Sequence, residues 1–251
     1  MKAKKKKSEI ILILILTVIS ALFIAPIVIV FMNSFKSKLF INSTPFALPN
    51  ADSFVGLANY GEGMIKTGFL QAFLVTLFIT VASVILIVLL TSMTAWYLVR
   101  VKSKFTKVLY YLFAFAMIVP FQMVMFTLVK VSNMFNLDNL IGIVFIYVGF
   151  GAGLSVFMFT GFIKSIPISL EEAAQIDGAG AIKRFFNVTL PMLSPTMFMV
   201  LILNIISSFQ VFDLINIMTE GGPGRSTNVL VYRIYQEGFQ QLKFGYASAM
   251  A

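Results

Sequence analysis

The chain has 251 residues, of which 59% are hydrophobic and only 12% are charged, so most of its surface must face a solvent other than water. It contains no Cys and no His, which excludes disulfides, thiolate nucleophiles, imidazole bases and the usual zinc and haem ligands. The formal charge of +9 does not indicate nucleic acid, because the basic residues stand in short blocks between apolar runs, as in membrane proteins.

Five uncharged runs are long enough to cross a bilayer, since a spanning helix needs about 20 mostly apolar residues. They cover Ile10–Met32, Phe69–Val99, Val108–Val129, Leu140–Ile163 and Met192–Met218. The strands of a membrane barrel would instead show segments of about ten alternating residues. The sequence therefore predicts an all-α fold, a polytopic transmembrane helical bundle.

Lysines and arginines near the helix ends predict the orientation, because such residues are retained on the cytoplasmic side. A cytoplasmic N-terminus places the larger basic group inside: Lys2, Lys4, Lys5, Lys6, Lys7, Arg100, Lys102, Lys104, Lys107, Lys164, Lys183 and Arg184. Residues 33–68 and the turn at 136–139 are then external, and residues 164–190 are cytoplasmic. The basic start also resembles a signal peptide, but its apolar run is too long for an h-region, so we expect it to be retained.

The end of the chain carries a further topology signal. After Met218 the sequence becomes polar, and it ends in small residues that resemble the start of another helix. An odd number of spans leaves this end outside, so we expect a sixth span beyond Ala251. We treat residues 1–251 as a single transmembrane domain with its core at about residues 69–251.

The cytoplasmic loop at residues 165–191 has the pattern of an ordered helical hairpin. Ser169 and Glu172 form a capping-box pattern, which predicts a helix that starts near Leu170. Asp177-Gly178 ends that helix, because glycine can adopt the positive φ of a helix C-cap. A second short helix is expected through residues 183–186.

Small and aromatic residues of this hairpin suit contact with a partner protein. Ala173 and Ala174 would let a partner backbone approach closely, and Phe185 and Phe186 would offer apolar area. An amphipathic loop that lies at the lipid headgroups would show a similar pattern, so the residues alone leave both interpretations open.

The series Glu172-Ala173-Ala174, Gly178 and Val188-x-Leu190-Pro191 resembles the EAA motif of ABC importer permeases. Residues 33–36, 117–120 and 164–167 resemble the maltose-transporter G type, whereas residues 54–60, 211–214 and 219–223 are more similar to the F-type partner. The resemblance implies a type I ABC importer permease fold and leaves the position in the heterodimer open. It also implies an ATPase-coupling role for Glu171, Glu172, Ala173, Ala174, Asp177, Gly178, Phe185, Leu190 and Pro191.

The same resemblance implies the partners of the chain. They are a second permease subunit, a dimer of ABC ATPases that binds ATP and Mg, and an extracytoplasmic sugar-binding protein, all at the bacterial plasma membrane and without nucleic acid. The sequence has no GxxxxGKS or GxxxxGKT phosphate-binding pattern, so ATP hydrolysis is expected in the partner. We expect no catalytic residue, metal or cofactor in this chain.

Polar residues at membrane depth usually face the bundle interior or a wet path, because they are costly against lipid. Six such residues in the fifth run are the candidates for the substrate path: Asn204, Ser207, Ser208, Gln210, Asp213 and Asn216. Beside Phe209 and Phe212 they would suit a sugar, which offers hydroxyl groups and apolar ring faces. For each residue the alternative is a hydrogen bond to a neighbouring helix.

Other polar or helix-breaking residues in the third and fourth runs are weaker candidates. They are Pro120, Gln122, Thr127, Tyr147 and Ser155. Pro120 frees a backbone carbonyl and could form a hinge. The cluster Gly149, Gly151 and Gly153 is more typical of close helix packing than of a gate.

These observations favour a permease subunit of an ATP-driven sugar importer. The same machinery could import a polyol, glycerol phosphate or another small solute, although no basic residue lies deep in the spans to bind an anionic cargo. A secondary transporter or channel would show inverted repeats or ionisable relays at the midplane. A membrane enzyme is the least favoured, because clustered carboxylates, His and Cys are missing from the spans.

Overall fold

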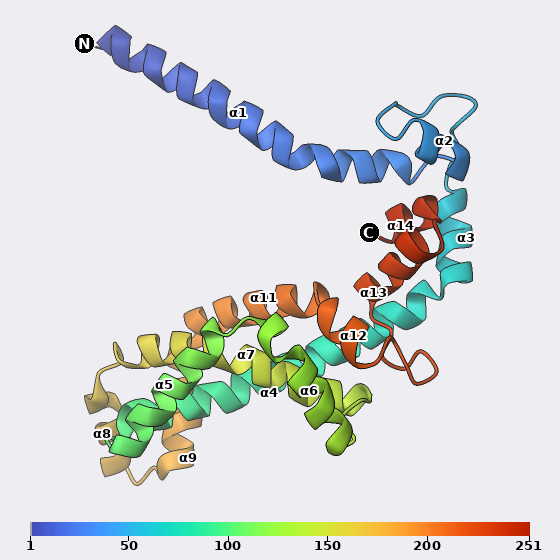
Figure 1. Cartoon of the computed structure of the whole chain (residues 1–251). Helices are drawn as coiled ribbons and strands as arrows, with labels where there is room; N and C mark the ends of the chain where they lie inside the picture. The colour runs from blue at the N-terminus through green and yellow to red at the C-terminus, as the bar shows by residue number, and fades with distance from the viewer. Residues whose placement is uncertain (1) are drawn as a thin grey trace. The chain divides into compact units, whose positions relative to one another are not determined.

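The computed structural model describes the backbone of residues 2–251 and the side chains from Glu9 onward. The side chains of Lys2 and Lys4–Lys7, on which the expected orientation partly rests, lie outside this range. All regular secondary structure in the described part is helical, as the sequence predicts (Figure 1). The chain divides into two compact units, one formed by residues up to Gln71 together with Arg233–Ala251, the other by Ala72–Tyr232.

The first unit combines the N-terminal helix with short helices from both ends of the chain. Helix α1 (Lys2–Asn33) contains an apolar stretch, Glu9–Asn33, that is long enough to cross a membrane and confirms the first predicted run. The other helices are α2 (Lys38–Ser43), α3 (Ala58–Thr67), the π-helical turn η2 (Gln236–Gln240) and α14 (Phe244–Met250). Helix α13 (Leu230–Tyr235) begins in the second unit and continues into the first.

Buried polar contacts hold the loop after α1 in place. The Asn59 side chain donates hydrogen bonds of 2.8 Å to the carbonyl oxygens of Ser34 and Lys36. Gly245 on α14 lies so close to Asn59 that a Cβ there would be 2.9 Å from the amide group. The segment between the first two spans is therefore an ordered structure rather than a free loop.

Two long helices run through the second unit as the sequence predicts. Helix α4 (Phe69–Arg100) and helix α7 (Leu140–Ile163) are both long and apolar enough to span a bilayer. Asn139 caps α7, because its side-chain oxygen accepts hydrogen bonds from the backbone N–H groups of Ile141 and Gly142. The second and fourth predicted runs are confirmed.

The third predicted run, Val108–Val129, is not one straight helix. It is divided into α5 (Lys104–Ile118) and α6 (Phe121–Met134), and the two axes are bent by 107°. The break lies at Val119-Pro120, where proline has no backbone N–H to continue the helix and its ring disfavours helical geometry in the residue before it. Val119 is accordingly extended, with φ −70° and ψ 117°.

The fifth predicted run, Met192–Met218, also differs from the structure. Helix α11 (Ser194–Phe209) ends before residues 210–212, and α12 (Asp213–Met218) is a separate short helix. At its other end α11 follows Ala181–Met192 with a bend of 77°. The described residues thus contain three straight candidate spans, or five if each bent pair is counted as one.

The remaining helices form the segment between α7 and α11. They are α8 (Ile168–Ile176), α9 (Ala181–Arg184), the π-helix η1 (Phe185–Thr189) and α10 (Leu190–Met192).

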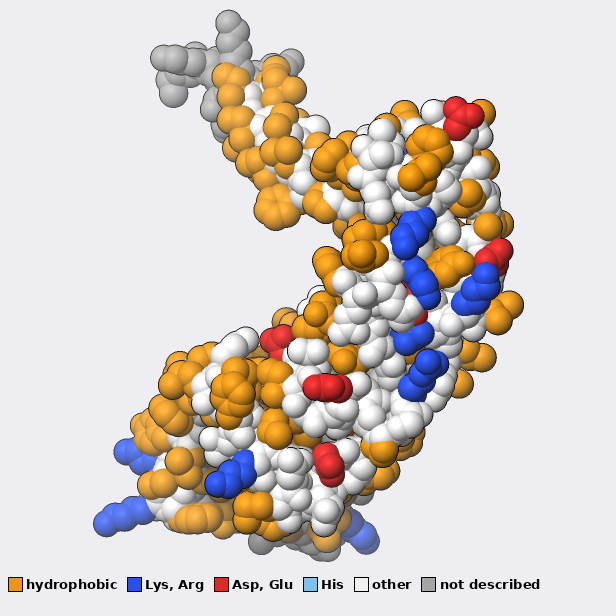
Figure 2. All heavy atoms as spheres, turned by 45° about the vertical axis from the view of Figure 1, so that its right-hand side comes forward, with side chains coloured by type: hydrophobic (Ala, Val, Ile, Leu, Met, Phe, Trp, Pro, Cys, Tyr) orange, Lys and Arg blue, Asp and Glu red, His pale blue; other side chains and the backbone are white. Residues whose placement is uncertain are grey.

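A buried apolar cluster joins this segment to the long helices. Its members from α4, α7, the following loop and α11 are Val84, Val88, Ala95, Phe159, Ile163, Ile166, Leu193 and Val200. Hydrophobic side chains are also widely exposed on the surface (Figure 2). Large exposed apolar patches indicate contact with lipid or with other protein chains.

Candidate functional site

The loop between α7 and α11 is a helical hairpin, but its first helix begins earlier than the sequence predicts. Helix α8 starts at Ile168, and Pro167 occupies the capping position without any side-chain cap. Proline has a fixed φ that suits the start of a helix. Ser169 therefore lies inside the first turn, and the predicted capping box with Glu172 is wrong.

The turn of the hairpin lies where the sequence predicts it. Gly178 has a φ of +82°, which is the left-handed conformation that glycine adopts most easily. Backbone hydrogen bonds from Asp177 to Ala173 and from Ala179 to Ala174 close the end of α8. The second arm follows as α9, η1 and α10, and the Arg184 side chain donates a 2.6 Å hydrogen bond to Gln175 across the hairpin.

Glu171 ties the hairpin to the end of α4. Its side chain is 4% exposed and forms a 2.8 Å ion pair with Arg100. The indole N–H of Trp96 and the hydroxyl of Thr189 each donate a 3.0 Å hydrogen bond to the same carboxylate. Arg100 also donates to the backbone carbonyl of Ile166. One carboxylate thus connects α4, α8 and η1.

The same contacts control the ionisation of Glu171. Burial opposes the charged form, but the hydrogen bonds from Arg100, Trp96 and Thr189 favour it, and the pKa of the carboxyl group is lowered from its ordinary value of 4.5. The carboxylate is therefore fully ionised at neutral pH, which keeps the ion pair with Arg100 intact.

The hairpin has a packed face and an open face. Phe185 is 2% exposed and packs edge-on against Trp96, with 5.8 Å between the ring centroids. The expectation that it offers apolar area to a partner is therefore wrong, whereas Phe186 is exposed. The other predicted residues on the open face are Glu172, Ala173, Asp177, Gly178 and Pro191, with Ala174 and Leu190 half-buried.

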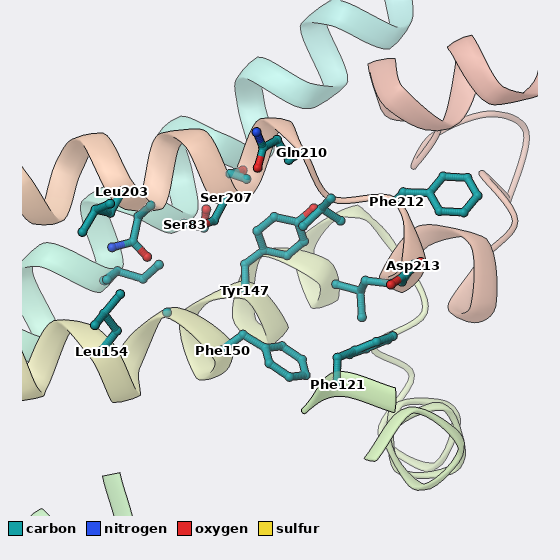
Figure 3. Close-up of a pocket in the computed structure, with 16 residues that line it drawn as sticks. Ser83, Phe121, Tyr147, Phe150, Leu154, Leu203, Ser207, Gln210, Phe212 and Asp213 are labelled. Atoms are coloured by element: carbon teal, nitrogen blue, oxygen red, sulfur yellow. The ribbon is translucent and has the colours of Figure 1, made fainter. Parts of the chain in front are cut away.

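A cavity of about 600 Å³ lies within the second unit. Residues of α4, α6, α7, α11, the break at 210–212 and α12 line it. Figure 3 shows the Tyr147 ring in the centre of this space, with Phe121 and Phe150 on one side and Gln210 on the other. The rings of Phe121 and Phe150 meet edge to face at 5.6 Å. Of the described lining residues, Asp213 alone carries a charge.

Some polar groups of the cavity are already paired with neighbouring helices. Ser208 and Thr80 share a 2.7 Å hydrogen bond, and Asn204 donates to Ser155 at 3.1 Å. The buried hydroxyl of Tyr147 has no hydrogen-bond partner among the described residues. A buried hydroxyl without a hydrogen-bond partner is energetically costly.

Gly151 brings three helices together at this cavity. A Cβ at this position would lie 2.5 Å from Ile87 Cδ1 on α4 and 2.6 Å from Asn204 Oδ1 on α11. Gly153 likewise lets α5 approach, because its Cβ would be 3.0 Å from the carbonyl oxygen of Phe113. The packing role expected for the glycine cluster is confirmed at these two positions, whereas Gly149 faces open space.

Comparison with known families decides the identity of the chain. Residues 87–251 match the family described as binding-protein-dependent transport system inner membrane component. The chain belongs to this family. It is a multi-pass membrane permease, and the resemblance seen in its EAA motif is confirmed.

Relatives of the permease serve sugar and glycerol-phosphate transport systems. It is 36% identical over 230 residues to the probable starch degradation products transport system permease protein AmyC of Thermoanaerobacterium thermosulfurigenes, covering 92% of this chain and 83% of that protein. It is 46% identical over 94 residues to the sn-glycerol-3-phosphate transport system permease protein UgpA of Pectobacterium atrosepticum, covering 37% of this chain and 32% of the relative.

A solved structure with the same fold comes from a bacterial ABC transporter involved in the import of the acidic polysaccharide alginate. The TM-score is 0.81 at 19% identity, and the match covers 98% of this chain and 91% of that chain. A likeness at this identity establishes the fold, which is that of an ABC importer permease.

The structure brings together most of the residues predicted for the path. Asn204, Ser207, Ser208, Gln210 and Asp213 line the cavity of the permease, whereas Asn216 is not among its lining residues. Of the weaker candidates, Tyr147 lines the cavity and Thr127 does not. Ser155 accepts a hydrogen bond from Asn204, and the Gln122 side chain lies 3.5 Å from the Asp213 carboxylate. Sequence reasoning missed Ser83, although a polar residue in an apolar run is the signal used for the other candidates. It also missed Ile87, Phe121 and Phe150, which are ordinary apolar span residues.

Proposed function

We propose that the permease is a membrane subunit of an ATP-driven carbohydrate importer. It would work with a second permease subunit, a dimer of cytoplasmic ATPases that binds ATP and Mg, and an external sugar-binding protein. The observation that carries the proposal is the hairpin, which exposes Glu172 and Ala173, with Ala174 half-buried, while Glu171 of the same helix is bound to Arg100.

The hairpin would act as the coupling element between the ATPase and the membrane helices. The small side chains of its open face allow a partner backbone to approach closely. The Glu171 contacts and the apolar cluster connect that face to α4, α7 and α11. When the ATPase dimer closes on ATP, its movement would pass through the hairpin to these helices. We propose that the hairpin and the N-terminus lie in the cytoplasm, as the distribution of basic residues predicts.

The cavity supports a neutral, hydroxyl-rich cargo. Aromatic rings from Phe121, Tyr147 and Phe150 offer apolar faces, and hydroxyl, amide and carboxylate groups offer hydrogen bonds. No lysine or arginine is found among the described lining residues, and Asp213 would repel an anion. The chemistry therefore favours a sugar over the glycerol phosphate named for the relative UgpA.

The turn at Gly178 provides a test with a matched control. A Cβ at Gly178 or at Gly180 would meet no atom within 4 Å, but Gly178 has a φ of +82° and Gly180 a φ of −65°. A valine is therefore strained at Gly178 and accommodated at Gly180. We expect Gly178→Val to lose the ATPase on co-purification in detergent and to lose sugar-stimulated ATP hydrolysis in proteoliposomes, while Gly180→Val keeps both.

Two results would overturn parts of this proposal. The native chain would be expressed with the ATPase and second permease of its own transport system. If no ATPase then co-purifies with it, the coupling role is wrong. If Gly178→Val behaves as Gly180→Val does, the turn of the hairpin does not matter for coupling. For the cargo, uptake of a neutral maltodextrin is expected to exceed that of glycerol 3-phosphate, and the reverse order would exclude a sugar.

A further inference from the structure

A second hollow, of about 480 Å³, lies at the end of the second unit where α4, α5 and α7 meet. It is separate from the cavity described above, and no lining residue is shared between the two. Its described lining residues define a surface that we call the basic pocket: Leu98, Lys102, Ser103, Lys104, Thr106, Lys107, Tyr110, Thr160 and Lys164.

The charge of the basic pocket is entirely positive. Four of its nine lining residues are lysines, and no described lining residue is acidic. Lys104 and Lys107 stand three positions apart on α5, so their side chains lie on the same face of the helix. Lys164 contributes from the end of α7, where its ammonium group lies 5.4 Å from the centre of the Tyr110 ring. Such a cluster attracts an anion.

The start of α5 adds to this attraction. Ser103 caps the helix, with its hydroxyl accepting from the Thr106 N–H and the Thr106 hydroxyl accepting from the Ser103 N–H. This reciprocal cap fixes the first turn of a 15-residue helix beside the lysines. The positive end of the helix dipole therefore lies at the pocket.

An independent observation is the Thr160 hydroxyl. Thr160 lines the pocket and is 3% exposed, yet its Oγ1 has no hydrogen-bond partner among the described residues. Three threonines of α4 in comparable helical settings donate instead to the carbonyl four residues earlier, namely Thr76, Thr91 and Thr94. A buried donor without a partner is energetically costly, so a hydrogen bond from Thr160 to a polar ligand would stabilise the complex.

The surroundings of the pocket favour a lipid as the source of the anion. Large apolar side chains on α5 are exposed beside the lysines: Phe105, Val108, Tyr111, Leu112 and Phe115. A headgroup phosphate in the pocket would leave the acyl chains of the same molecule against this apolar surface. Free phosphate would use the lysines and Thr160 but would leave the apolar flank without a role.

We propose that the basic pocket binds the headgroup phosphate of an anionic phospholipid, with the lysines supplying the charge and Thr160 donating a hydrogen bond. Pockets of basic residues between membrane helices are suited to such headgroups. The site does not depend on the cargo or on the ATPase partner.

Binding can be measured on the intact permease by native mass spectrometry in detergent, with phosphatidylglycerol, phosphatidylcholine and inorganic phosphate as the three probes. We expect phosphatidylglycerol to bind more tightly than phosphatidylcholine. Lys104→Gln together with Lys107→Gln should weaken phosphatidylglycerol binding, by about fivefold for each lysine. Lys183→Gln removes one charge outside the pocket, so it is the control for each single lysine variant and should leave the affinity unchanged.

Thr160→Val tests the hydroxyl with almost no change of shape. We expect it to weaken phosphatidylglycerol binding by roughly tenfold, as for a lost hydrogen bond to a charged group. The melting temperature in lipid-free detergent should stay the same or rise, because the unpaired hydroxyl is removed. Thr94→Val, whose hydroxyl is already bonded within its own helix, should leave lipid binding unchanged.

Several outcomes would overturn the proposal. Equal affinity for phosphatidylglycerol and phosphatidylcholine would show that the pocket does not select an anionic headgroup. Displacement of phosphatidylglycerol by inorganic phosphate at similar concentration would make free phosphate the ligand. If Lys183→Gln weakened phosphatidylglycerol binding as much as the pocket variants do, the affinity would depend on the overall charge of the protein and not on the pocket.

Discussion

Replacing Glu171 by leucine and Arg100 by methionine, singly and together, measures how firmly the hairpin is held to α4. The side chains of Glu171 and Arg100 are 4% and 15% exposed, so either single change leaves a largely buried charge without its partner. Removing one member of such a pair costs about 3–5 kcal/mol. We expect about 3 kcal/mol for Arg100→Met, in which Glu171 keeps Trp96 and Thr189, and about 4 kcal/mol for Glu171→Leu, which also leaves those two donors unpaired.

The double variant separates the pair from its surroundings. Without either charge, the remaining cost comes from the unpaired donors of Trp96 and Thr189, about 3 kcal/mol together. Two independent losses would sum to about 7 kcal/mol, so we expect a coupling energy of about 4 kcal/mol between Glu171 and Arg100. The free energy of unfolding in mixed micelles gives all three values.

The single tryptophan of the chain provides a local readout of the same contact. Trp96 donates its indole N–H to Glu171 and packs against Phe185, so detachment of the hairpin should shift its fluorescence emission. The Thr94→Val variant, two positions before Trp96 on α4, is the control, because its hydroxyl bonds within its own helix. Additive losses in the double variant, together with unchanged Trp96 emission in Glu171→Leu, would refute the anchoring role of Glu171.

Two other predictions follow from the same geometry. Because the pKa of Glu171 is lowered from 4.5, the contribution of its carboxylate to stability should be complete at neutral pH and disappear as the pH falls below about 4.5 through the folded-state pKa. The loss should appear as a shift of Trp96 fluorescence emission that Glu171→Gln abolishes. Emission of the native chain that does not change with pH would contradict this prediction. Gly151→Ala should lower stability by about 1–3 kcal/mol and reduce sugar uptake, because its Cβ would overlap Ile87 and Asn204. Gly149→Ala, which meets no atom within 4 Å, is the control, and equal effects of the two alanines would exclude the packing argument.

The sequence predicts straight spans well and bent ones poorly. Helices α4 and α7 follow directly from the length of their apolar runs, and Gly178 marks the hairpin turn because only a positive φ lets the chain reverse there. An apolar run does not reveal whether its helix is straight or bent, however, so the sequence indicated Pro120 only as a possible hinge. The break at residues 210–212 contains neither Gly nor Pro and has no local signal.

The internal contacts of the site were beyond sequence reasoning for a different reason. Glu171 and Arg100 are 71 positions apart, and neither stands in a pattern that indicates the other. The path residues of α11 were found because polar groups are rare in an apolar run, whereas Phe121 and Phe150 resemble every other span residue. Chemistry is visible locally in the sequence, but the meeting of distant residues depends on the packing of the helices.

Helix α4 contributes to both sites, with Ser83 and Ile87 in the cavity and Trp96 and Arg100 at the hairpin. The 13 positions from Ser83 to Trp96 correspond to about 20 Å along one uninterrupted helix. Thermodynamic linkage makes any communication along this helix reciprocal. If a ligand in the cavity raises the affinity of a partner for the hairpin by some factor, that partner must raise the affinity of the cavity for the ligand by the same factor.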